Sequence, residues 1–382
     1  MWKYATVFIV TGNVWLMACA PAAKPRISPS TITPPAATAN GNGSSSGHQL
    51  SYWQNLAARQ PSQAWPSAAE DCAIIYDPVN RALVLFGGKD DADSNRAETW
   101  AFFLTTGQWQ NLTGDHQQPP PSEDHTAIYD PVSHRMLLYG GENGPTSNAL
   151  WSLDLNTQRW RNLTDSTAPR REDHTAIYDS RGRRMIIFGG RDNERYNLAE
   201  VWALDLDPAS PTFEKWSNLT FSQKYNPGRV DHVAVFDSVK NRMVIFGGWD
   251  KEEKEYLGDT WGFSLADNRW YKIKTKHSHP PQRRHAVMAL DGRRNWAILC
   301  GGFGEEGYLN DVWAFDLTDD VWINLTPGPQ PRIDHQAVFD PVAGRLLLYG
   351  GDARLRTKFH DLWELRVAPQ FSPEILQEAK RR

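Results

Sequence analysis

The chain has 382 residues, which is enough for two or three ordinary domains or for one large all-β unit of the barrel or propeller kind. Its formal net charge of −4 at pH 7 provides no basic field for neutralising phosphates, so we expect no nucleic-acid partner. Aromatic residues make up 12% of the chain, with 17 tryptophans, and lysine, glutamate and leucine do not follow the periods of long helices. The sequence therefore predicts strands rather than helices.

Residues 1–18 predict a signal peptide. The basic Lys3 precedes an apolar run that is too short to predict a membrane span, and Ala18 stands directly before Cys19. Residues 16–19 resemble the lipobox of bacterial lipoproteins, and this resemblance implies a mature chain that begins at Cys19 and carries acyl chains there. We therefore expect a lipid-anchored protein on the extracytoplasmic side of the bacterial cell envelope, with an ordinary secretory signal as the alternative.

Residues 19–50 are rich in proline, alanine, serine, threonine and glycine, and they contain almost no large apolar residues. Such a segment buries too little apolar surface to offset the entropy of ordering it. It predicts a flexible tether between the lipid and the remainder of the chain.

Six copies of one unit follow the tether, at intervals of roughly fifty residues. Each copy has a glycine pair, an aspartate ten residues before the first glycine, and a short apolar run between them. The runs are too short for helices and are bounded by turn residues, so they predict buried strands. The glycine pairs are Gly87-Gly88, Gly140-Gly141, Gly189-Gly190, Gly247-Gly248, Gly301-Gly302 and Gly350-Gly351.

Two tryptophans complete a typical copy: one starts a third strand, and one begins a W-x-N-L motif that predicts a fourth strand. The sixth copy lacks its fourth strand, whereas an extra "WQNL" at Trp53 precedes the first copy. In a circular array, the strand at Trp53 would complete the sixth sheet and leave no open edge. We therefore predict an all-β, six-bladed β-propeller over residues 51–367, followed by a short tail at 368–382.

The glycine pairs and the spaced tryptophans resemble the kelch-repeat family over about residues 51–367. The resemblance implies a six-bladed β-propeller, in agreement with the count of copies, and it implies little about activity. We expect the chain to be a monomer.

In an up-and-down meander, the loops between the second and third strands emerge on one face. The loops that lead into the first strand of the following copy emerge on the same face. The former differ widely from copy to copy, and variable loops on a rigid scaffold are where binding usually occurs. Arginine could grip a carboxylate there, and aromatic rings could stack on a sugar. We therefore expect a protein or carbohydrate partner at this face. The candidate binding residues are Arg229, Arg283, Arg284, Arg332, Trp249, Phe303 and Tyr308.

Acid–histidine pairs stand at the start of several first strands, such as Asp124-His125 and Asp173-His174. A metal needs three or four ligands converging at about 2.0 to 2.2 Å, and symmetric positions around a propeller axis lie too far apart for that. The repeated pairs predict capping or inter-blade hydrogen bonds, and we expect neither a metal nor another cofactor.

A binding module without catalysis is the favoured function. The alternative is a sugar-acid isomerase similar to the bacterial sialic acid mutarotases, which are also kelch propellers; their chemistry requires an acid–base residue and an arginine. Glu172 with Arg171, or Glu123 with Arg284, could supply these groups. A copper site similar to that of galactose oxidase is not expected, because Cys72 and Cys300 read as small buried hydrophobes.

Overall fold

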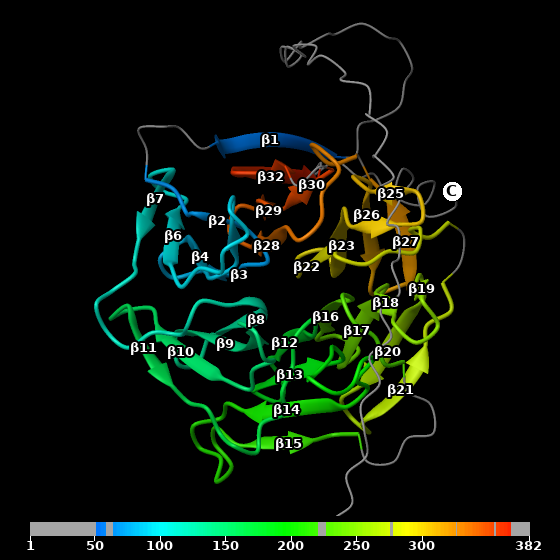
Figure 1. Cartoon of the computed structure of the whole chain (residues 1–382). Coiled ribbons are helices and arrows are strands. Elements are labelled where there is room, and N and C mark those ends of the chain that lie inside the picture. The colour runs from blue at the N-terminus through cyan, green and yellow to red at the C-terminus, as the bar shows by residue number, and fades with distance from the viewer. Residues whose placement is uncertain are drawn as a thin grey trace, which may run out of the picture. The chain divides into compact units, whose positions relative to one another are not determined.

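A computed structural model of the chain describes residues 51–58, 64–220, 227–275, 278–325, 327–354 and 357–367, all within one compact unit. These residues form six four-stranded antiparallel sheets arranged as blades around a central axis (Figure 1). Within these ranges, no helix is long and apolar enough to cross a membrane. The predicted signal peptide, the tether with Cys19, and the tail lie outside the described residues.

The strands of each blade follow one another from the axis outward. Blades 1 to 3 are β3 (Ala73–Asp77), β4 (Ala82–Phe86), β6 (Thr99–Phe103) and β7 (Gln108–Asn111); β8 (Glu123–Asp130), β9 (Arg135–Glu142), β10 (Leu150–Asp154) and β11 (Arg159–Asn162); and β12 (Thr175–Asp179), β13 (Arg184–Phe188), β14 (Val201–Asp205) and β15 (Trp216–Asn218). Blades 4 to 6 are β16 (Val233–Asp237), β17 (Arg242–Phe246), β20 (Thr260–Ser264) and β21 (Arg269–Lys272); β22 (Val287–Asp291), β23 (Trp296–Cys300), β26 (Val312–Asp316) and β27 (Val321–Asn324); and β28 (Gln336–Asp340), β29 (Arg345–Tyr349), β32 (Asp361–Val367) and β1 (Ser51–Ala58).

The N-terminal strand closes the ring, as predicted. β1 pairs antiparallel with β32, so that Trp53 lies opposite Leu365 and Ser51 lies opposite Val367. In Figure 1 the blue strand β1 accordingly lies beside the red-orange strand β32. The first and last strands of the propeller therefore share one sheet, and the fold prediction is confirmed.

The glycine pairs join each blade to the next. The second glycine of every pair donates its backbone N–H to a carbonyl at the entrance of the following blade: Gly88 to Ser122 (2.9 Å), Gly141 to Arg171 (2.8 Å), Gly190 to Arg229 (2.8 Å), Gly248 to Arg283 (2.7 Å), Gly302 to Arg332 (2.9 Å) and Gly351 to Ala69 (2.7 Å). The first glycine has no room for a side chain. At Gly140, where φ is 74°, an added Cβ would lie 2.4 Å from the Arg171 carbonyl oxygen.

The aspartate ten residues before each glycine pair caps the turn between the first and second strands. Asp77 accepts hydrogen bonds from the backbone N–H groups of Val79 and Asn80, at 2.9 and 3.3 Å. This Asx turn explains why the turn has nearly the same length in every copy.

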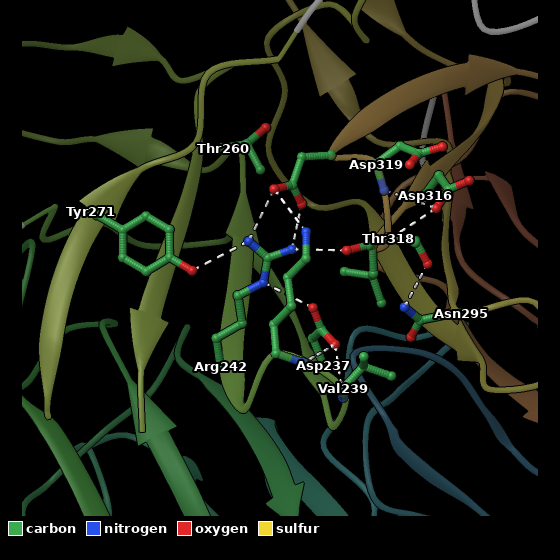
Figure 2. Close-up of polar contacts among 12 residues, drawn as sticks. Asp237, Val239, Arg242, Thr260, Tyr271, Asn295, Asp316, Thr318 and Asp319 are labelled. Carbon is green, nitrogen blue, oxygen red and sulfur yellow. Dashed lines mark hydrogen bonds and ion pairs between the residues drawn. The ribbon is translucent and has the colours of Figure 1, made fainter. Parts of the chain in front are cut away.

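In blade 4 the capping aspartate also holds a buried arginine. The Arg242 side chain is 2% exposed, and its Nε donates to Asp237 at 2.9 Å. Its Nη groups donate to the Tyr271 hydroxyl (3.3 Å), to the Leu317 carbonyl (3.1 Å) and to Asp320, the latter two belonging to blade 5. Figure 2 shows this guanidinium between Tyr271 and Asp237. Arg242 therefore links two neighbouring blades.

The tryptophan of the fourth strand packs against the preceding blade. Trp322 of β27 is 1% exposed, and its ring centroid lies 4.9 Å from that of Phe246 in blade 4 and 4.8 Å from that of Phe315 in its own blade. Its Nε1 donates to the Thr260 hydroxyl of blade 4 at 3.3 Å. The recurrent W-x-N-L motif therefore contributes to the core between blades.

Candidate functional site at the loop face

Short hairpins joining second to third strands gather at one end of the propeller. We call this end, with the residues that enter each first strand, the loop face. The strands that form it are β2 (Ala68–Glu70) with β5 (Lys89–Asp90), β18 (Trp249–Asp250) with β19 (Glu255–Tyr256), β24 (Phe303–Gly304) with β25 (Gly307–Tyr308), and β30 (Asp352–Ala353) with β31 (Thr357–Lys358).

Six side chains at equivalent positions surround a central cavity of about 260 Å³ that opens at the loop face. All six are partly exposed, and all have a positive φ between 52° and 55°, a conformation that aspartate tolerates better than most residues. We call them the aspartate ring: Asp71, Asp124, Asp173, Asp231, His285 and Asp334. Five carboxyl groups thus converge on one cavity.

His285 is the basic member of the ring and lies between two acidic members. Its Nδ1 is 2.7 Å from Asp334 Oδ1, and its Nε2 is 3.4 Å from Asp231 Oδ2. Burial alone would lower the imidazole pKa, but the two carboxylates outweigh it and raise that pKa to about 10. Burial raises the pKa of Asp231 to about 6, whereas for Asp334 the attraction of His285 outweighs burial and lowers the pKa. This side of the ring is therefore internally compensated.

Arg191 compensates the third acidic member. Its Nε lies 2.6 Å from Asp173 Oδ2, and its Nη1 lies 2.9 Å from Glu172 Oε1. Glu172 is 1% exposed, and burial together with a hydrogen bond to Glu142 raises its pKa to about 8. One guanidinium therefore holds two acids of blade 3.

Asp71 and Asp124, in adjacent blades, have no such partner. Among the described residues, no side chain forms a hydrogen bond or ion pair with either carboxyl group, although both lie within 4.8 Å of a Glu123 oxygen and of each other. Glu123 itself forms an ion pair with Lys89. Burial, and then repulsion from neighbouring acids, raises the pKa of Asp71 and of Asp124 well above the usual range.

The histidines that follow the ring positions belong to the scaffold, as predicted. His174 Nε2 hydrogen-bonds with the Thr126 hydroxyl of the preceding blade at 2.8 Å, and His232 Nε2 does the same with Thr175. Burial lowers the pKa of His174 to about 3, so this imidazole is neutral at pH 7. The aspartates of the same pairs differ from that prediction, because they turn to the cavity instead of the blade interface.

The structure brings four of the predicted binding residues together. The Arg284 guanidinium lies 5.2 Å from the ring centroid of Trp249, and Phe303 lies 5.1 Å from Tyr308. Tyr256 connects the two pairs, because its ring centroid lies 4.7 Å from that of Trp249 and 6.1 Å from that of Phe303. We call these five residues the aromatic cluster. It spans the hairpins of blades 4 and 5, beside His285.

The other predicted arginines do not present their guanidinium groups to the cavity. Each lies 1 to 2% exposed inside its own blade, where it reaches the acid two positions before the third-strand tryptophan. Arg283, for example, donates to the Gly301 carbonyl (2.9 Å) and to Asp311 (2.6 Å), and Asp311 also accepts from Trp313 Nε1. The corresponding pairs are Arg171–Glu200, Arg229–Asp259 and Arg332–Asp361. These guanidinium groups are buried and already form ion pairs within their own blades, so they are not presented to a ligand carboxylate in the cavity.

The two acid–arginine pairs considered for sugar-acid chemistry are not assembled. Arg171 pairs with Glu200, while Glu172 pairs with Arg191. Glu123 and Arg284 belong to blades 2 and 5, which are three blades apart in a ring of six. The geometry therefore does not favour the isomerase alternative.

Comparison with known proteins agrees with the fold. The family model for the KLHDC2/KLHL20/DRC7 Kelch-repeats domain matches residues 48–207 and 129–327. The chain belongs to the kelch-repeat family.

Three curated relatives match parts of the chain. Kelch domain-containing protein 10 of Rattus norvegicus is 26% identical over 79% of the chain and 76% of its own length. Adagio-like protein 1 of Oryza sativa subsp. japonica is 29% identical over 64% of the chain and 40% of its own length. The flagellar outer arm dynein alpha chain of Chlamydomonas reinhardtii is 30% identical over 38% of the chain. The chain spans 3% of the dynein chain and 32 to 40% of the next three relatives.

Proposed function

We propose that this kelch propeller is a protein-binding module that recognises its partner at the loop face. The kelch fold and the kelch-domain relatives fit such a module. The observation that carries the choice of face is the aromatic cluster. It breaks the sixfold repetition in blades 4 and 5, whereas the glycine, histidine and tryptophan contacts recur around the ring.

Aromatic side chains with an adjacent arginine are enriched at the centres of protein interfaces, because they bury a large area with little loss of conformational freedom. A carbohydrate could stack on the same rings, and it is the second partner class that the sequence predicts. The edge-to-face packing of Phe303 on Tyr308 occupies part of these ring faces, which favours a protein partner.

We expect a photo-crosslinking amino acid at Tyr196, which is 45% exposed in the loop between β13 and β14, to capture the partner protein. The same group at Val239, in a turn at the opposite end, should not capture it. The double variant Trp249→Ala, Phe303→Ala should weaken the interaction at least about tenfold, as interface anchors do. Equal capture from both ends, or full binding by the double variant, would contradict the proposed face.

We further propose that the propeller is held in the bacterial cell envelope by a lipid on Cys19, and this rests on the sequence of residues 1–19 alone. In a bacterial host, the full chain should incorporate a palmitate analogue and sediment with membranes. The Cys19→Ser variant should lose the label and become soluble. Persistent labelling of that variant would place the lipid elsewhere or refute the proposal.

A further inference from the structure

On one side of the central cavity, two acidic members of the aspartate ring lack an ion-pair partner among the described residues. Asp173 has Arg191, and Asp231 and Asp334 share His285. Asp71 and Asp124, at the entrances of blades 1 and 2, have no ion-pair partner among the described residues. The unpaired acids therefore line the cavity on the side of blades 1 and 2.

Two lysines near these aspartates already form ion pairs with neighbouring glutamates. Lys89 binds Glu123, and Lys358 Nζ lies 2.8 Å from Glu70 Oε1. Each glutamate immediately precedes an unpaired aspartate, so both ammonium groups form their ion pairs with the glutamates. Lys89 attracts the two aspartates only without an ion-pair contact, and burial with repulsion from other acids outweighs this attraction. Repulsion across the cavity, which adds to burial in raising both aspartate pKa values, would be relieved by a cation from outside.

We propose that the central cavity receives a lysine side chain of a protein partner, with its ammonium group between Asp71 and Asp124. This inference rests on the proposed function, and it names the residue that the loop face recognises. The ammonium would repeat the contacts that Lys89 and Lys358 make with the adjacent glutamates. Small side chains such as Ala73 and Ala127 line the cavity beside the two acids and leave space for a four-carbon stem.

A metal ion is the other occupant that carboxylates could attract. It would need the oxygens of Asp71, Asp124 and Glu123 together, because these three are the group whose oxygens lie within 4.8 Å of one another. Glu123 is held by Lys89, so a metal would have to displace an existing ion pair. A lysine requires only the two free carboxylates.

The aromatic cluster lies over blades 4 and 5, across the ring from this acidic side. A partner segment whose lysine enters the cavity would place a neighbouring side chain against Trp249 or Phe303. We therefore expect an apolar or aromatic residue close to the lysine in the recognised segment.

The inference can be tested by selecting random twelve-residue peptides on the immobilised full chain. Selected peptides should share a lysine, and its replacement by norleucine, which keeps the stem but removes the charge, should weaken binding at least about tenfold. The double variant Asp71→Asn, Asp124→Asn should bind the lysine and norleucine forms equally. Asp267→Asn, which removes an exposed charge from a turn of blade 4, is the matched control and should behave as wild type.

The outcomes separate this inference from the proposed function. Some selected peptides could require the aromatic cluster for binding but bind equally well without their lysine, or bind equally well to the double Asn variant. Either result would overturn the lysine site and leave the proposed binding module intact. Displacement of the peptides by millimolar CaCl₂ or MgCl₂ at constant ionic strength would assign the cavity to a metal and would also overturn it. Failure to select any peptide that depends on the loop face would count against both. Thermal unfolding checks that the Asn variants fold; loss of the repulsion should leave them at least as stable as wild type.

Discussion

The variant Arg242→Met is expected to lower the free energy of unfolding by about 3 to 5 kcal/mol. Methionine replaces the aliphatic stem but leaves the Asp237 carboxylate, which is fully buried, without its guanidinium partner. The variant also removes the donors to the Leu317 carbonyl and to Asp320, which link blade 4 to blade 5. The loss is therefore felt at a blade interface as well as within one turn.

Chemical denaturation of the full chain measures this effect, with Arg181→Met as the control. Arg181 occupies an exposed position in the corresponding turn of blade 3 and should change stability by no more than about 0.5 kcal/mol. Exposed ion pairs contribute no more than about 1 kcal/mol. If the free energy of unfolding of Arg242→Met lies within about 1 kcal/mol of the wild-type value, Arg242 is not the inter-blade link described above.

Deletion of residues 1–58 should have the second large effect, because it removes the fourth strand of blade 6. Trp53 packs against the core of blades 5 and 6, while Leu56 and Ala57 pack against the core shared with blade 1. Without β1, the edge of β32 is open to other chains. We expect the unfolding midpoint to fall by at least about 10 °C and the protein to aggregate, whereas deletion of residues 1–47 should cause neither change.

A circular permutant provides the decisive control for the closure. Ser51 lies opposite Val367, so a short Asn-Gly turn after Val367 could lead directly into residues 51–58 as a hairpin. Transfer of the strand to that position should return the unfolding midpoint of the truncated chain to the wild-type value. Failure of the permutant to recover would mean that β1 contributes by something other than its pairing with β32.

The fold could be predicted almost completely because each of its devices recurs. Every copy repeats a turn-capping aspartate, a glycine pair that fits only without a side chain, and tryptophans at fixed distances. The unmatched motif at Trp53 even predicted which strand closes the ring. Residues that recur in every copy indicate a scaffold role, because each blade must pack against its neighbour in the same way.

The site was harder to predict, because side-chain direction is not recorded in the repeat. The sequence analysis assigns Arg229, Arg283 and Arg332 to binding, but each precedes an acid and a tryptophan at nearly constant spacing. That recurrence is the sequence signal for a scaffold role. The sequence predicts the same scaffold role for the aspartates and for the histidines that follow them. Their positive φ turns the two side chains of each pair in different directions, and no sequence pattern shows that.

The closure of the ring also bears on how the molecule forms. A ribosome makes β1 before any other strand of the propeller and makes β32 last, so the two partners of this sheet are separated by nearly the whole synthesis time. Blades 1 to 5 consist of strands that are consecutive in the sequence and can assemble as they emerge. The sixth blade alone requires contact between the first and last strands of the propeller, which makes its formation the slow, high-contact-order step. The native state is therefore reached only after translation has supplied β32.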